Sequence, residues 1–243
     1  MITKLENFLN QDQIDSLIGL TEKLPSRPGD ASAGNAIKAK KKSTVYDDVT
    51  FPGSSSLSSN QRNQIHSMVF HRQNMVDRIA NEVTCGEFSN VFSSIAVYNE
   101  GDFYDWHLDR LTTGQGVPID ISYTIFLNDP EEYMGGSLLV KHDYGTTTFK
   151  EKAGTAVFYP SACLHRVDEV VSGSRKVVLG LINCTVSSPH DRHLLTELTN
   201  CIHGLDEYSD ILSSSMIDTT GLDDINRSLH YVQMQLNKRF MKH

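Results

Sequence analysis

The sequence predicts a mainly β protein with flanking helices, an α+β fold whose core is a sandwich or jelly roll. Short β-rich runs fill the middle of the 243-residue chain, from Phe92 to Cys184, and turn residues separate them. Helical periodicity marks the chain on both sides of these runs. We therefore expect helices and a long loop packed on the core at 1–91, the β core at 92–187 and a helical extension at 188–243.

The first expected element is an amphipathic helix. Asn10 is a candidate N-cap, and Ile14, Leu17, Ile18 and Leu24 recur on one face at helical spacing. An apolar stripe of this kind is typical of a helix that packs against a core.

Residues 25–58 are expected to form a loop, because Pro, Gly and Ser recur in them, with one short strand near Ser43–Val49. The basic cluster Lys38–Lys42 lies in this loop. It is either an ordinary solvated segment or one that contacts substrate over the site, since long loops in compact domains are often functional.

A second helix should begin near Asn60, because apolar residues from Ile65 to Val83 form one stripe. Eight strands should follow, each bounded by turn residues. Their expected ranges are 93–98, 103–108, 121–127, 137–141, 146–151, 155–159, 164–171 and 176–183. The predicted turn between the last two strands is Ser172-Gly173-Ser174.

Helical periodicity returns after Ser188, where Pro189 suits the first position of a helix. The last helix should begin after Gly221. Its expected buried stripe consists of Leu222, Ile225, Leu229, Val232, Leu236 and Phe240.

The composition is that of a globular protein. The formal net charge of −8 argues against a nucleic-acid partner, whose binding rests on cationic contacts to phosphate. No long apolar stretch predicts a signal peptide or a membrane span. The four cysteines show no CxxC spacing, which favours a reduced compartment. We therefore expect a cytoplasmic protein without a membrane or nucleic-acid partner; the oligomeric state is unknown.

The sequence His107-Leu-Asp109 gives two candidate metal ligands, and His165 gives the third. On an extended strand, residues i and i+2 point to the same face, so His107 and Asp109 can converge on one ion while Leu108 packs inward. His165 opens a strand expected on the other side of the sheet order. Two imidazoles and one carboxylate are a facial ligand set for Fe(II) that leaves positions open for substrate and O₂.

Arg175 follows His165 by ten residues and can bind a carboxylate through two parallel hydrogen bonds. With the three ligands it indicates an oxygenase that uses Fe(II) and 2-oxoglutarate; by itself it could be an ordinary strand-edge Arg. If Arg175 points inward, Lys176 should point to solvent. Tyr98 could hydrogen-bond the cosubstrate or be a half-buried core residue. His190 and His193 are expected to be exposed residues of a first helical turn.

An ordered series of motifs carries a family resemblance: Tyr98-x-x-Gly101, His107-x-Asp109, Ser122–Asn128, Gly135-Gly136, Ala153–Pro160 and His165 with Ser172–Arg175. With these motifs the chain resembles the prolyl 4-hydroxylase branch of Fe(II)- and 2-oxoglutarate-dependent dioxygenases, and within it the bacterial PKHD-type hydroxylases.

The resemblance implies a double-stranded β-helix core and a role for Arg175 in binding the distal carboxylate of 2-oxoglutarate. It implies hydroxylation of an unactivated C–H bond in a prolyl, peptidyl or small-metabolite substrate, with succinate and CO₂ as coproducts and a benefit from L-ascorbate. Many relatives place a cosubstrate-binding Tyr in the strand that ends in Leu-Asn, whereas this chain has Ile125 and Phe126 just before Leu127-Asn128. The polar partners of Arg175 therefore stay open, and Tyr98 gains weight as a candidate. An alternative is a non-catalytic jelly roll that senses iron or 2-oxoglutarate.

Overall fold

A computed structural model describes residues 2–29, 41–46, 64–70, 73–84, 88–113, 116–186 and 188–241. The chain divides into two compact units. The β unit combines Ile2–Met75 with Ser89–Asn183, and the helical unit combines Val76–Phe88 with Cys184–His243. The three-part division expected from the sequence stays a prediction.

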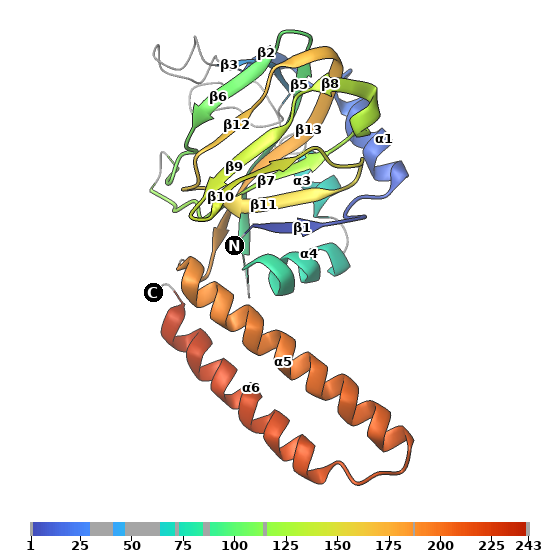
Figure 1. The fold of residues 1–243 in the computed structure, drawn as a ribbon, viewed down its shortest axis with the longest axis vertical. Coiled ribbons are helices and arrows are strands. Elements are labelled where there is room, and N and C mark those ends of the chain that lie inside the picture. Colours follow the sequence, from blue (N-terminus) through green and yellow to red (C-terminus); the bar gives the residue numbers. More distant parts are fainter. Residues whose placement is uncertain are drawn as a thin grey trace. The chain divides into compact units, whose positions relative to one another are not determined.

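The β unit contains two sheets, which can be followed in Figure 1. The larger sheet has the order β1 (Thr3–Leu5), β11 (Ala156–Pro160), β7 (Ile121–Phe126), β13 (Val170–Cys184), β5 (Phe88–Asn99), β4 (Thr44–Tyr46) and β2 (Ser26–Pro28), and β8 (Tyr133–Gly135) pairs with β13. The smaller sheet has the order β10 (Gly145–Phe149), β9 (Leu138–His142), β12 (His165–Val167), β6 (Phe103–His107) and β3 (Lys41–Lys42).

The core of the β unit lies between these sheets. Buried residues of the larger sheet, among them Ala96, Phe126 and Val177, form one cluster with Val140 and Phe149 of the smaller sheet. Each strand contributes the side chains of one face, so short strands suffice to build a continuous apolar layer. The fold is therefore mainly β with flanking helices, and the predicted class is confirmed.

Helix α1 (Gln11–Leu20) begins as the sequence predicts. The Asn10 side chain accepts a hydrogen bond from the backbone N–H of Gln13, and the Gln13 side chain accepts one from the backbone of Asn10. This reciprocal capping box satisfies two N–H groups that the first turn leaves unpaired. Ile14 and Leu17 are buried, whereas Leu24 lies beyond the helix and is only partly buried.

The single helix expected after Asn60 is divided. The described residues form α3 (Gln64–Val69), α4 (Gln73–Ile79) and a π-helical turn, η1 (Ala80–Thr84). Phe70 ends α3, and its ring packs against His66 and edge-on against Tyr123 of β7. Asn60 and the Lys38–Lys40 part of the basic cluster lie outside the described residues.

The predicted turn at residues 172–174 is wrong, because β13 runs through it without interruption. The break lies earlier, between β12 and β13, at Asp168-Glu169. Gly173 adopts φ +79°, and a Cβ there would collide with the backbone oxygen of Glu132 and lie 2.9 Å from Tyr133 Cα. Glycine therefore serves here for close approach of β8 and not for a chain reversal.

The helical unit is built on α5 (Pro189–Ser214) and α6 (Thr220–Phe240). Ser188 caps α5 by accepting a hydrogen bond from the Asp191 N–H, as its position before Pro189 predicts. Within this unit Leu236 and Phe240 pack against the buried Val186 and Leu195.

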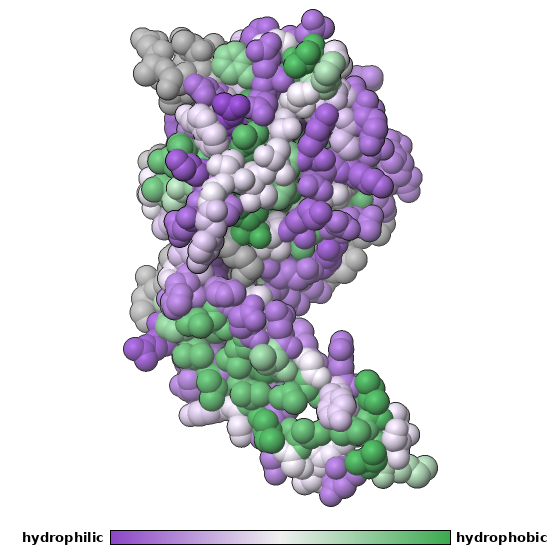
Figure 2. All heavy atoms as spheres, viewed as in Figure 1, coloured by the Kyte–Doolittle hydropathy of each residue, from purple (hydrophilic) through white to green (hydrophobic). Residues whose placement is uncertain are grey.

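The predicted buried stripe of α6 is only partly correct, because Ile225 and Val232 are 53% and 46% exposed. Figure 2 shows apolar side chains gathered along α5 and α6. Two helices that pack on each other bury only one narrow stripe of each, which leaves the rest of a broad apolar face uncovered. None of the helices in the described ranges is long and apolar enough to cross a membrane.

Candidate active site

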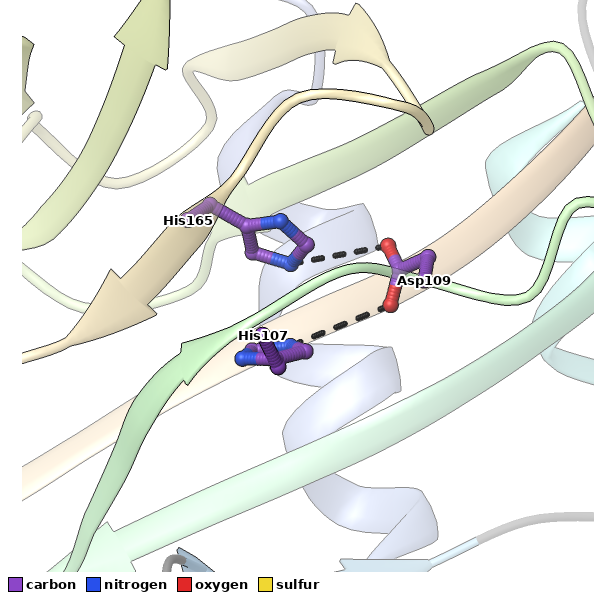
Figure 3. Close-up of side chains that lie close together, drawn as sticks. All are labelled: His107, Asp109 and His165. Atoms are coloured by element: carbon purple, nitrogen blue, oxygen red, sulfur yellow. Dashed lines mark ion pairs between the residues drawn. The ribbon is translucent and has the colours of Figure 1, made fainter.

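The structure brings His107, Asp109 and His165 together (Figure 3). His107 ends β6 and His165 begins β12, and the two residues face each other in the antiparallel pairing of these strands. Their ring centroids are 4.1 Å apart. The carboxylate oxygens of Asp109 lie 3.9 Å from His107 Nε2 and 3.5 Å from His165 Nε2. One potential ligand atom from each residue lies within 4.8 Å of the other two.

Two details of the sequence prediction are wrong. The strand of His165 is the direct neighbour of the strand of His107 and does not lie on the other side of the sheet order. Asp109 follows the end of β6, so strand alternation does not orient it, and Leu108 is 55% exposed. The loop that turns away after His107 sets the direction of the carboxylate. On this loop, which carries Asp109, the side chains of Leu108 and Leu111 are exposed.

Backbone carbonyl groups fix both imidazole rings. His107 Nδ1 lies 2.8 Å from the Asp105 carbonyl oxygen, and His165 Nδ1 lies 3.0 Å from that of Cys163. A carbonyl oxygen only accepts hydrogen bonds, so each Nδ1 carries the proton and donates it. The lone pair of each neutral ring then lies on Nε2, the atom that points toward Asp109.

Ser122 holds the carboxylate. Its hydroxyl donates a 2.6 Å hydrogen bond to Asp109 Oδ2 and lies 2.9 Å from the buried Ser161 hydroxyl. Ser122 belongs to β7 and is 1% exposed. Sequence reasoning assigned no role to Ser122 or Ser161. Ser122 reaches Asp109 from β7, and Ser161, just after β11, contacts Ser122, an arrangement that no spacing in the sequence indicates.

Arg175 points into the interior and is completely buried. None of its three side-chain nitrogens has a hydrogen-bond partner among the residues that the structure describes. The guanidinium carbon lies 5.1 Å from the Tyr98 ring centroid and 5.4 Å from that of Phe126. Burial lowers the pKa of Arg175, yet a guanidinium keeps its charge in proteins. Lys176 is partly buried and does not extend fully into solvent.

Tyr98 and Tyr159 connect Arg175 with the three candidate ligands. Tyr159 lies 4.9 Å from the His165 ring, and both tyrosines belong to the same buried cluster. Burial raises the pKa of Tyr98 and of Tyr159 more than any other cause. The negative charge of Asp109 raises the two pKa values further, and the positive charge of Arg175 lowers them. Both hydroxyls are therefore protonated, and both interact electrostatically with Asp109 and Arg175. Tyr98 is 1% exposed, more deeply buried than a half-buried core residue.

These groups fit Fe(II) and a dicarboxylate. Two nitrogens and one carboxylate suit a non-haem iron site with open positions, whereas a closed structural zinc site needs four protein ligands. A buried cation without an anionic partner is costly, and a carboxylate ligand would compensate it.

Other histidines do not form a comparable group. His190 is exposed, and His193 Nδ1 lies 3.9 Å from a carboxylate oxygen of the exposed Glu197. In the described ranges of the chain, His107, Asp109 and His165 are the one set of three His, Cys, Asp or Glu side chains close enough to share a metal ion.

Comparison with known proteins defines the class. Residues 93–183 match the family model of the 2OG-Fe(II) oxygenase superfamily. An oxidoreductase of the 2OG-Fe(II) oxygenase family from Burkholderia pseudomallei superposes with a TM-score of 0.59, covering 75% of this chain and 85% of that one. At 17% sequence identity this likeness shows a shared fold. Fold and superfamily match together define a 2OG-Fe(II) oxygenase.

Two relatives define the family. A PKHD-type hydroxylase of Hyphomonas neptunium is 30% identical over 83% of this chain and 86% of its own length. A PKHD-type hydroxylase of Acaryochloris marina is 40% identical, over 49% of this chain and 56% of its own length. The chain belongs to the PKHD-type hydroxylases, which are oxidoreductases. The superfamily uses Fe(II) and 2-oxoglutarate, as the sequence predicts.

Proposed function

We propose that this protein hydroxylates an unactivated C–H bond, with Fe(II) held by His107, Asp109 and His165. The observation that carries this proposal is the convergence of one ring nitrogen from each His and one carboxylate oxygen within 4.8 Å of one another. The hydrogen bonds to Nδ1 and from Ser122 support it, because partners behind the ligands fix their orientation before a metal binds.

In this proposal Arg175 receives the distal carboxylate of 2-oxoglutarate, and Tyr98, whose ring lies beside Arg175, hydrogen-bonds the cosubstrate through its phenol. The unpartnered nitrogens of the buried Arg175 support this role. Bound Fe(II) would supply the activation of O₂. One oxygen atom of O₂ would enter the substrate as hydroxyl and the other would enter succinate, while CO₂ leaves. L-ascorbate would serve as the reductant that keeps iron ferrous.

The substrate proposed is a prolyl or other peptidyl residue, or a small metabolite. A cytoplasmic location stays a prediction of the sequence.

Anaerobic visible spectroscopy of the Fe(II)-loaded protein tests the proposal. A charge-transfer band should develop on addition of 2-oxoglutarate, and a His107→Ala variant that folds normally should not give it. His190→Ala is the matched control, because His190 is exposed at the start of α5. Folded protein with bound iron and no band would overturn the proposal. A band without succinate formation after O₂ is admitted would favour the sensing module over the enzyme.

A further inference from the structure

Helices α5 and α6 contact each other along one side of each helix. Three hydrogen bonds between side chains mark this side, and they join Thr199 to Gln233, Asp206 to Asn226, and Ser209 to Asp223. The two helices run antiparallel, because rising residue numbers on α5 meet falling numbers on α6. We call these six residues the contact positions.

The residues on one side of the contact positions are apolar. Successive residues of an α-helix are about 100° apart, so in two antiparallel helices the residues just before the contact positions lie on the same side of the pair. These residues, which we call the apolar face, are Leu198, Leu205, Tyr208, Leu222, Ile225 and Val232. Tyr208, Ile225 and Val232 are 54%, 53% and 46% exposed. Apolar side chains gather along both helices in Figure 2.

The opposite side of the helix pair is mainly polar. The residues that directly follow the contact positions lie there, and they are Asn200, Glu207, Asp210, Asp224, Arg227 and Met234. Met234 is the apolar exception. A helix pair with one apolar and one polar side is typical of an element that packs against a further partner.

The spacing of the apolar residues fits a partner made of helices. Along α6, intervals of three and four residues alternate between Leu222, Ile225, Leu229, Val232 and Leu236. In helical bundles, side chains at this spacing fit between the side chains of a neighbouring helix.

Charge along the helix pair favours a second copy of the same pair as that partner. Residues 203–229, around the connection between the helices, contain six acidic residues and one Arg, a net charge of −5. Residues 189–202 and 230–241, at the other end, contain three basic and two acidic residues, a net charge of +1. Two copies laid antiparallel place the acidic end of each beside the basic end of the other. A parallel arrangement would place the two acidic ends together, which like-charge repulsion disfavours.

The apolar face is large enough for a dimer interface. Helix α6 has 21 residues, so the face is about 30 Å long, and two packed helices are about 20 Å wide. The resulting area of about 600 Å² lies within the range of about 600–1,000 Å² that each partner buries in a specific complex.

We propose that two copies of this protein form a symmetric dimer, in which the α5–α6 pairs pack antiparallel through the apolar face as a four-helix bundle. The second copy then covers Ile225 and Val232, the two residues of the expected buried stripe of α6 that are exposed in a single copy. The proposal concerns the helical unit alone and does not depend on the proposed function.

Sedimentation velocity of the full chain tests the proposal. The unmutated protein should sediment with twice the monomer mass of 27.2 kDa. Val232→Glu should raise the dissociation constant of the dimer about a hundredfold or more, because symmetry places the new charge in the apolar interface twice. Met234→Glu is the matched control and should leave the dimer intact, since Met234 is 50% exposed on the opposite side of the same helix.

Charge reversal tests the antiparallel orientation. Arg239 directly precedes Phe240, which packs against Leu195 of α5, so Arg239 lies on the side of the apolar face at the basic end. Arg239→Glu should raise the dissociation constant about tenfold at low salt and less at high salt, because salt screens charges at the rim of an interface. An unchanged constant at low salt would contradict the antiparallel orientation.

Two results would overturn the dimer itself. One is a chain that keeps the monomer mass throughout the micromolar concentration range. The other is a dimer that survives Val232→Glu, since it would have to use another surface. Circular dichroism should show equal helix content in all variants, because the replaced side chains are exposed in a single copy. If Val232→Glu lost helix content, Ile225→Glu would apply the same test at another exposed residue of the apolar face.

Discussion

Ser122 ties the candidate metal ligands to the larger sheet. Asp109 lies on the loop after β6 of the smaller sheet, whereas Ser122 lies on β7 of the larger one. The 2.6 Å hydrogen bond between them therefore orients a carboxylate that strand geometry leaves free. The buried Ser161 hydroxyl forms a hydrogen bond with the Ser122 hydroxyl and so helps to hold it in place.

Removal of this hydrogen bond should weaken metal binding. We expect Ser122→Ala to lower the affinity for Fe(II) about tenfold, because partners behind a metal ligand typically contribute 10–100-fold. Competition with a chromophoric chelator under anaerobic conditions measures the affinity. Ser172→Ala on β13 is the control, since Ser172 is exposed. Equal affinities of the Ser122→Ala variant and the unmutated protein would refute the assigned role.

At the residue scale, His107, Asp109 and His165 converge, and Arg175 is buried, while the roles that the sequence predicts for them stay predictions. His107, Asp109, His165 and Arg175 carry groups whose use as ligands or anion partners is specific. Ser122 and Ser161 are common residue types. Their importance arises from strand pairings between distant segments, which a single sequence does not encode locally.

At the element scale, β13 depends on the close approach of β8. Gly135, Gly136 and Gly173 all have positive φ at this junction, and a side chain at Gly173 would meet the backbone of Glu132 and Tyr133. The junction also positions Tyr133 beside Arg175. The glycines that this junction requires therefore also determine which side chains lie beside Arg175.

Substitution of Gly173 should therefore be costly. We expect Gly173→Ala to lower the free energy of unfolding by about 2 kcal/mol or more, because alanine combines an unfavourable φ with a backbone collision. Chemical denaturation measures the change. Gly204→Ala in α5 is the matched control: Gly204 has no atom within 4 Å of an added Cβ, and alanine there should stabilise the helix by up to about 1 kcal/mol. A neutral Gly173→Ala variant would contradict the steric argument.

Elements with a local signal were predicted well. The capping box of α1 and the Ser188-Pro189 start of α5 depend on a few adjacent residues, and both are found. Strands β1, β2 and β8 were missed, because three-residue strands carry too little alternation to be recognised. The continuous strand β13 was predicted as two strands, because a glycine such as Gly173 can mark either a turn or a point where another strand lies close to the backbone.

At the scale of the whole molecule, binding of Fe(II) and 2-oxoglutarate at the site should raise the stability of the β unit. The site combines a buried cation with two imidazoles and a carboxylate that converge. Ligands that bind only the folded chain stabilise it by RT ln(1 + [L]/Kd), about 2.7 kcal/mol at 100 times Kd.

Thermal unfolding without O₂ checks this coupling. Fe(II) should raise the melting temperature, 2-oxoglutarate should raise it further, and a chelator should reverse both effects. The gain from metal should shrink in acid, since only neutral imidazole binds a metal ion. His107→Ala should lose the gain and serves as the control. A melting temperature that does not respond to metal would show that the site is not coupled to folding.

Strand β13 has a consequence for protein engineering. It supplies Arg175 and also lies between β7 and β5 in the middle of the larger sheet. Redesign of the pocket around Arg175, the proposed cosubstrate site, would therefore also disturb a central strand of the larger sheet. The loop after His107 carries the ligand candidate Asp109, but its Leu108 and Leu111 side chains are exposed. Directed evolution should change the range of accepted substrates more readily at Leu108 and Leu111 than it changes the dicarboxylate cosubstrate.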